Sequence, residues 1–299
     1  MVSSTYLPPE LLSLSHHILT TTRWSGLGRH ALNLLQNQQD ATPEMWSAIT
    51  AACDAAAAKG VSLLPGAEEE ATNLGLEKWT LALQKKYNVP SQGRAVLYTT
   101  YQCYLRDISK RMAAHLEKAS KEGYIAGVKL VRGAYLTSEP KHLTFDSKAG
   151  TDANYDACAD AVVRQQWTEK IPAPTPGTPF PKVNIVLATH NLASVQAAQK
   201  IRAEQMLSTA PENLPRLTYA QLQGMADEIS QALVQDETMK ADTQAKVVKC
   251  MTWGTTTECL NFLLRRASEN KEAALRTEDT RKAMGNELWR RLRGVFGPA

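Results

Sequence analysis

The sequence lacks the cysteine and histidine patterns that mark disulfide frameworks and metal sites. Its cysteines are odd in number, scattered and without any C-x-x-C pair: Cys53, Cys103, Cys158, Cys250 and Cys259. The six histidines show no metal-ligand spacing either. We therefore expect reduced thiols and no bound metal.

Long apolar runs and concentrated charge are also missing. No apolar run approaches the roughly 20 residues of a membrane-spanning helix. The 34 basic and 30 acidic residues nearly balance at +4, which argues against a dedicated nucleic-acid-binding protein. In the first 39 positions Glu10 is the single acid. That composition faintly resembles a transit peptide, although a disordered or helical N-terminus explains it equally well.

A regular alternation of short apolar segments and helical segments is present. Six segments are typical of strands: 61–65, 94–101, 127–135, 183–191, 217–225 and 245–254. Residues 171–181 contain five prolines and are expected to form a surface loop. We find no repeat and no linker, so we expect a helical region over 1–60 and one α/β domain over 61–299.

Six strand–helix units with apolar strands predict a parallel sheet covered by helices. Such a sheet is either open and doubly wound or closed into a barrel. No strand leads into G-x-G-x-x-G, so the fingerprint of the dinucleotide fold is missing. A full (β/α)₈ barrel has eight strands, two more than the pattern supplies. The periodicity alone leaves both architectures open.

Polar residues gather where three expected strands end. Arg132 and Gly133 follow one strand, residues 189–191 (T-H-N) follow another, and Gln221 lies near the end of a third. Each has an ordinary explanation, such as a turn glycine or a helix cap. Because the carboxyl ends of parallel strands meet at one edge, their common position favours a ligand site.

The segment N-F-L-L-R-R-A-S-E-N, residues 261–270, predicts an amphipathic helix. Arg265, Arg266 and Glu269 fall on one face, and the leucines fall on the opposite face, as expected for a helix that lies on a core. The arginine face is either solvent-exposed, with an i,i+4 ion pair, or binds an anion. A nucleic acid or another acidic ligand is the more distant alternative for that anion.

Four blocks, in this order and spacing, resemble the signatures of the proline dehydrogenase family. They are K-L-V-R-G-A-Y at 129–135, A-T-H-N at 188–191, Q-L-Q-G-M at 221–225, and W-G-T-T-T-E-C-L-N-F-L-L-R-R-A-S-E-N at 253–270. The resemblance spans about residues 61–294. It implies a (β/α)₈-type barrel, incomplete here because only six strands are evident, and an FAD cofactor. It also implies mitochondrial residence, a quinone acceptor, association with the inner-membrane surface, and no nucleic acid.

The resemblance also implies roles around the flavin. Lys129 is the catalytic residue beside the reactive edge of the isoalloxazine ring, where a cation stabilises negative charge on the reduced flavin. The cofactor-binding residues are expected to be Val131, Gly133, Ala134, Thr189, His190, Asn191 and Gln221.

The same resemblance assigns the diarginine helix to the substrate. Arg265 and Arg266 clamp the carboxylate of proline with charge-assisted hydrogen bonds, and Glu269 helps to hold them. Leu130 and Tyr135 wall the pocket. Holding the ring near flavin N5 is proximity catalysis, and the expected product is Δ1-pyrroline-5-carboxylate.

Three departures from the family pattern bear on activity. Gly66 stands where the family has an aspartate, and the two preceding strands, one with a lysine in K-L-[ST]-A-L, are not evident. Both favour the alternative of a catalytically weak or inactive member. Cys250 replaces a tyrosine that stacks on the proline ring. The space it leaves favours 4-hydroxyproline or a bulkier cyclic amine, with neutral drift as the alternative.

Overall fold

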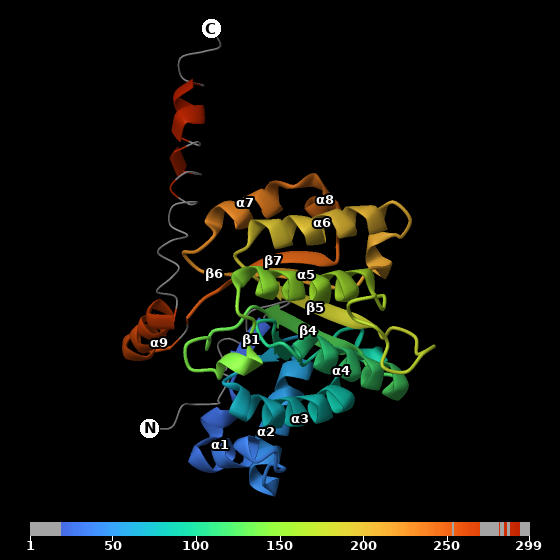
Figure 1. The fold of residues 1–299 in the computed structure, drawn as a ribbon, viewed down its shortest axis with the longest axis vertical. Coiled ribbons are helices and arrows are strands. Elements are labelled where there is room, and N and C mark those ends of the chain that lie inside the picture. Colours follow the sequence, from blue (N-terminus) through green and yellow to red (C-terminus); the bar gives the residue numbers. More distant parts are fainter. Residues whose placement is uncertain (1–18, 253, 270–280, 282–283, 286–287, 294–299) are drawn as a thin grey trace.

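The computed structural model describes residues 19–252, 254–269, 281, 284–285 and 288–293. Strands and helices alternate along them as a repeated β/α pattern (Figure 1). The strands are β1 (Leu19–Thr22), β2 (Ser62–Pro65), β3 (Thr99–Gln102), β4 (Ala126–Val131), β5 (Val183–Ala188), β6 (Leu217–Leu222) and β7 (Ala245–Cys250). The helices are α1 (Arg29–Gln36), α2 (Pro43–Ala58), α3 (Glu70–Tyr87), α4 (Ile108–Glu122), α5 (Lys148–Arg164), α6 (Leu192–Met206), α7 (Asp227–Gln235), α8 (Glu237–Ala241) and α9 (Thr256–Glu269).

All strand pairings are parallel and follow the order of the chain. β1 pairs with β2, and β3 to β7 form a five-stranded sheet. Leu63 joins the two sheets, because its N–H donates to the Val96 carbonyl at 2.7 Å and its carbonyl accepts from Tyr98 N–H at 3.0 Å. The result is the strand order of a β/α barrel. Among the described residues no pairing joins β1 to β7, so the barrel is not closed.

The six predicted strands are all present, but the expectation that residues 1–60 are purely helical missed β1. This strand reads L-T-T-T, and it has no apolar alternation that would reveal it. Its pairing with β2, from Leu19 opposite Ser62 to Thr22 opposite Pro65, supplies the long-range contact that holds it extended. The predicted division at residue 60 stays a prediction.

Local signals set most helix ends. Thr42 caps α2 by accepting a hydrogen bond from Met45 N–H at 3.3 Å, with Pro43 at the first helical position. Asn191 caps α6 in the same way, through Ser194 N–H. Gly123, at φ 73°, ends α4 as expected. Residues 171–181 form an irregular loop, with Ile171 and Pro181 buried and most of the others exposed.

Two clusters of unequal size lie on opposite faces of the five-stranded sheet, and a third packs α1 to α3 against β2. Val128 and Leu130 of β4, and their neighbours in β5 and β6, pack against α4 to α7 in a large cluster. The opposite face carries a small cluster that includes Leu64, Tyr98 and Val186. Because side chains alternate along a strand, Lys129 and Val131 belong to this inner face of the curved sheet.

α9 does not lie on the core as its leucine face predicts. Leu260, Leu263 and Leu264 are all exposed, and the helix stands off from the sheet and its covering helices in Figure 1. The amphipathic pattern correctly predicted a helix, but periodicity does not specify which surface a helix covers.

Close approach of two helices makes Gly75 a sensitive position. A Cβ at Gly75 in α3 would lie 2.1 Å from the carbonyl oxygen of Leu35 in α1. We expect Gly75→Ala to lower the free energy of unfolding by about 2–3 kcal/mol, measured by urea denaturation, because backbone must move. Gly66→Ala is the control, since its Cβ would lie 3.8 Å from the Thr22 carbonyl oxygen. Equal losses in the two variants would contradict this account.

Candidate active site

Arg132 links four elements at the carboxyl edge of the sheet. Its Nε donates to Asp152 Oδ1 of α5 at 2.6 Å, and its Nη1 donates to Thr189 Oγ1 at 2.7 Å. Its Nη2 donates to Ser194 Oγ in α6 at 3.0 Å. The guanidinium also lies 4.4 Å from the ring centroid of Tyr155. This side chain therefore fixes the end of β5 and the start of α6 relative to β4.

Sequence reasoning noticed Arg132 at a strand end but gave it no role. The sequence carries a partial signal for this role, because Asp152 lies near the start of the next helix. The other two partners, Thr189 and Ser194, lie farther along the chain, beyond the following strand. Burial alone raises the pKa of Asp152, but hydrogen bonds from Lys148 and Arg132 outweigh it and hold this pKa below its usual value. The stabilisation from this ion pair is thus present at neutral pH and is lost only as the pH falls through that lowered value.

The T-H-N residues lie together next to Arg132. The Thr189 hydroxyl, which accepts from Arg132, also accepts from Asn191 N–H at 3.0 Å. His190 Nε2 accepts from the N–H of Leu222 at 3.0 Å, so this nitrogen carries no proton and the ring bridges β5 and β6. The three residues gather at one edge as predicted, and the chain itself uses part of their hydrogen-bonding capacity.

Gln221 lies beside Thr189, but its amide is buried. Its Nε2 donates to the Thr189 carbonyl at 3.4 Å, and its Oε1 accepts from Ser230 Oγ at 3.0 Å. In β6 it shares the helix-facing side with Leu217 and Tyr219. Gln221 therefore supports Thr189, and its side chain points toward the covering helices and not toward the inner face of the sheet.

Lys129 and Leu130 take opposite faces of β4. Lys129 pairs in register with Thr100 and Val186 on the inner face. Leu130 is 0% exposed in the cluster between the sheet and its helices. Strand alternation thus turns Leu130 away from Lys129, toward the covering helices, and its expected role as a wall of the substrate pocket stays a prediction.

The turn after β4 is shaped by a tyrosine ring. Gly133 has φ 130°, and a Cβ there would lie 1.4 Å from ring carbons of Tyr104. Glycine is thus required by this contact. The Tyr104 hydroxyl in turn donates to buried Glu139 at 3.1 Å. Ala134 continues the turn and is partly buried.

Arg23, at the end of β1, reaches Tyr135 across the strand ends. Its Nη2 donates to the Tyr135 hydroxyl at 3.0 Å. No ion pair to Arg23 is found among the described residues. The expectation that the K-L-[ST]-A-L block has no equivalent stays a prediction, and Arg23 is a candidate site residue that sequence reasoning missed.

Gly66 and Glu68 lie on the same side of the site. Gly66 N–H donates to the Thr22 carbonyl at 2.9 Å, which places it beside the residue before Arg23. The Glu68 carboxylate accepts a hydrogen bond from Ser25 Oγ, and the Glu68 carbonyl accepts from Gln102 Nε2 at 2.7 Å. Glu68 therefore places a carboxylate in the loop after β2, two positions after Gly66.

Cys250 ends β7 opposite Leu222 and is partly exposed. Thr256, where α9 begins, follows six positions later. The side chains of Arg265, Arg266 and Glu269 lie outside the described part of the structure. The carboxylate clamp therefore stays a prediction.

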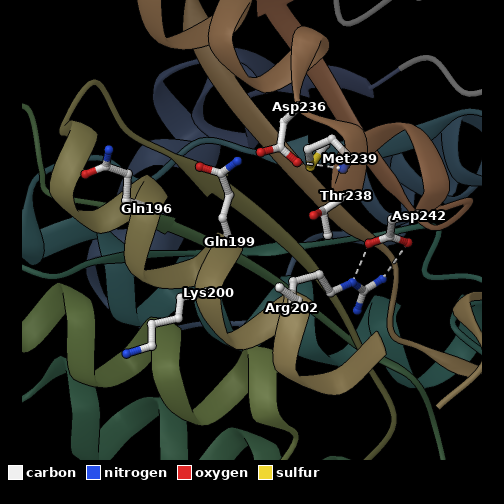
Figure 2. Close-up of a pocket in the computed structure, with 9 residues that line it drawn as sticks. Gln196, Gln199, Lys200, Arg202, Asp236, Thr238, Met239 and Asp242 are labelled. Carbon is white, nitrogen blue, oxygen red and sulfur yellow. Dashed lines mark hydrogen bonds and ion pairs between the residues drawn. The ribbon is translucent and has the colours of Figure 1, made fainter. Parts of the chain in front are cut away.

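A cavity of about 320 Å³ lies elsewhere, between α6 and α8 (Figure 2). It holds no predicted site residue. Beside it, buried Arg202 donates to Asp242 at 2.5 and 3.1 Å and to the Pro215 carbonyl at 2.8 Å. Asp242 precedes β7 and Pro215 precedes β6, so this ion pair belongs to the amino edge, where a β/α barrel is stabilised.

Comparisons with known proteins decide the family. The sequence profile described as proline dehydrogenase matches residues 8–279. The chain belongs to the proline dehydrogenase family. It is 31% identical to a probable mitochondrial proline dehydrogenase of Schizosaccharomyces pombe, over 83% of this chain and 50% of that protein. It is 32% identical to mouse hydroxyproline dehydrogenase, over 80% and 50%. For human mitochondrial proline dehydrogenase 1 the identity is 32%, over 78% and 36%.

The chain spans half the length, or less, of these relatives. Among solved structures, a proline utilization A (PutA) variant of Bradyrhizobium japonicum aligns with a TM-score of 0.60 at 22% identity, over 85% of this chain and 24% of that one. PutA of Bdellovibrio bacteriovorus gives 0.59 at 21%, over 82% and 23%. These similarities establish the fold: the proline dehydrogenase domains of such proteins are (β/α)₈ barrels, and the described residues of this chain have the same arrangement without closure.

The network of Arg132 makes a prediction about stability. Arg132→Met should lower the free energy of unfolding by about 2 kcal/mol in urea, because it removes charge-assisted hydrogen bonds that are mostly shielded from water. Arg132→Lys should recover part of that loss. Arg164→Met is the matched control, since its ion pairs to Asp160 and Glu204 are exposed and should matter little. A loss at Arg164 as large as that at Arg132 would refute the assignment.

Proposed function

We propose that this chain forms the flavin-dependent oxidising site for L-proline or 4-hydroxyproline, giving Δ1-pyrroline-5-carboxylate or its hydroxy form. The observation that carries the proposal is the carboxyl edge of the sheet, where the turn at residues 133–135 and the T-H-N segment lie just beyond Lys129 of β4, in a chain of this family. We propose the same oxidation activity for the whole protein.

The residues at this edge fit FAD in their chemistry. Lys129 offers a cation on the inner face, the turn at Gly133 is exposed beside the Tyr104 ring, and Thr189 to Asn191 precede the amino end of α6. A helix amino end favours a phosphate. When bound, FAD supplies the hydride acceptor, and we propose that Lys129 stabilises negative charge beside it. Val131, Ala134 and His190 complete this set, with Gln221 supporting Thr189.

The substrate is proposed to lie between the flavin and the side chains near the ends of β1, β4 and β7. Tyr135 forms one wall, and Arg23 adds a guanidinium that donates to the neutral hydroxyl of Tyr135. Arg265 and Arg266 bind the carboxylate with Glu269 beside them. Orientation by these cations supplies the proximity that hydride transfer requires, and the reaction needs no protein nucleophile.

A catalytically weak member is the second candidate, favoured by Gly66. The position has no carboxylate, and the Glu68 carboxylate already accepts from Ser25. A Cβ at Gly66 meets ordinary contacts only, so a side chain can begin there without a clash. The names of the relatives support mitochondrial residence, and a quinone at the inner-membrane surface is the proposed acceptor.

Anaerobic reduction tests the proposed activity directly. The purified protein should be yellow, and L-proline or trans-4-hydroxy-L-proline should bleach the flavin absorbance in the absence of oxygen. Stable yellow colour without bleaching would support the weak member instead, and Gly66→Asp should then restore bleaching. As controls, Arg265→Ala and Arg266→Ala should keep flavin content and raise KM roughly 100-fold, as expected for a lost charge-assisted hydrogen bond.

The small side chain of Cys250 leads to a prediction about which of the two substrates the protein prefers. The wild-type protein should have a higher kcat/KM for trans-4-hydroxy-L-proline than for L-proline, because a small side chain leaves room beside the ring. Cys250→Tyr should shift this ratio toward proline by about 10-fold or more, and Cys250→Ser, of similar volume, should leave it unchanged. A clear preference of the wild type for proline would contradict the assignment.

A further inference from the structure

A short segment near the carboxyl end carries apolar and basic side chains side by side. Residues 288–293 read L-W-R-R-L-R, are helical, and are all exposed. They belong to the red helix near the C label in Figure 1. Leu288, Trp289 and Leu292 remain 60%, 57% and 49% exposed. Three large apolar side chains within five positions are rarely left in water without a binding partner.

The helical period sorts these six residues into two faces. At about 100° per residue, Leu288, Trp289 and Leu292 fall within an arc of about 100°. The arginines at 290, 291 and 293 occupy the rest of the circumference. An apolar arc flanked by arginines is typical of helices that lie in the plane of a membrane surface.

Tryptophan and arginine have complementary places at such a surface. An indole ring sits at the level of the lipid headgroups, where one part is apolar and another is wet. The Arg293 guanidinium lies 5.4 Å from the ring centroid of Trp289. This contact keeps a positive charge at the depth of the ring, where lipid phosphate and carboxylate groups lie.

Charge complementarity indicates which kind of partner binds the helix of residues 288–293. The segment carries three positive charges and no acid, in a chain whose net charge is +4. A second copy of the same segment would bring arginines against arginines, which repel. An anionic lipid layer supplies both the apolar region for the leucines and the negative charge for the arginines.

We propose that residues 288–293 dock the protein on an anionic membrane surface, with Leu288, Trp289 and Leu292 inserted and the arginines at the headgroups. The inference deepens the proposed function, because it identifies the part of the chain that meets the membrane holding the quinone. Docking itself requires neither quinone nor proline, so the docking proposal and the proposed oxidation activity can be refuted independently of each other.

Vesicle flotation of the full chain tests the docking. The probes are vesicles of phosphatidylcholine alone and of phosphatidylcholine mixed with phosphatidylserine, both without quinone. The wild type should float with the mixed vesicles, and added salt should release it. The triple variant Arg290→Gln, Arg291→Gln, Arg293→Gln should weaken partitioning on the order of 100-fold. Trp289→Ala should weaken it as well.

Matched control variants test whether membrane binding depends on this segment or on the overall charge and hydrophobicity of the surface. The charge control removes three exposed lysines spread over the body: Lys59→Gln, Lys118→Gln and Lys200→Gln. The apolar control is Leu207→Ala, at an 88% exposed position. Both controls should float like the wild type.

Three results would overturn the proposal. The first is equal binding to neutral and mixed vesicles, and the second is unchanged binding of the triple variant. The third is a dimer, seen by light scattering, that Trp289→Ala dissociates, since a second copy would then cover this face. Proline oxidation with a soluble dye acceptor is measured beside these tests, and it should be the same in the triple variant and the wild type.

Discussion

The guanidinium of Arg132 is the interaction on which the geometry of the candidate site depends. Its donors reach a carboxylate in α5, a hydroxyl at the end of β5 and a hydroxyl in α6. A planar fork of donors suits this task, because each bond constrains the direction of the others. The polar edge that the family would use for a cofactor is therefore built around one cation that is already satisfied by the protein.

A second group of contacts ties the beginning of the chain to the same edge. β1 extends the parallel order beyond β2, and Arg23 reaches from its end to Tyr135. Ser25 and Glu68 join the loops after β1 and β2. Gly66, where we expect an acid in the family, lies in the second of these loops. The opposite side of the site is held by the hydrogen bonds of Arg132.

The two edges of the sheet have different roles, and the contacts show why. At the amino edge, Arg202 and Asp242 are almost wholly buried and are paired with each other. Such a pair holds α6 against the loops that enter β6 and β7, and it has little freedom to bind anything else. At the carboxyl edge Arg132, His190 and Asn191 are only partly buried and follow the ends of strands. Binding and chemistry are therefore expected at the carboxyl edge.

The sequence by itself determined the six apolar strands, the helices between them, the family, and the gathering of residues 189–191 with the turn after β4. Those features depend on local periodicity, on caps and on the rule that parallel strands end at one edge. The tertiary structure alone decided that L-T-T-T becomes β1, that Leu130 faces the helices and that Gln221 is buried. It also decided that the leucines of α9 stay exposed. Each of these depends on which surface a segment meets, and a partner distant in the sequence sets that choice.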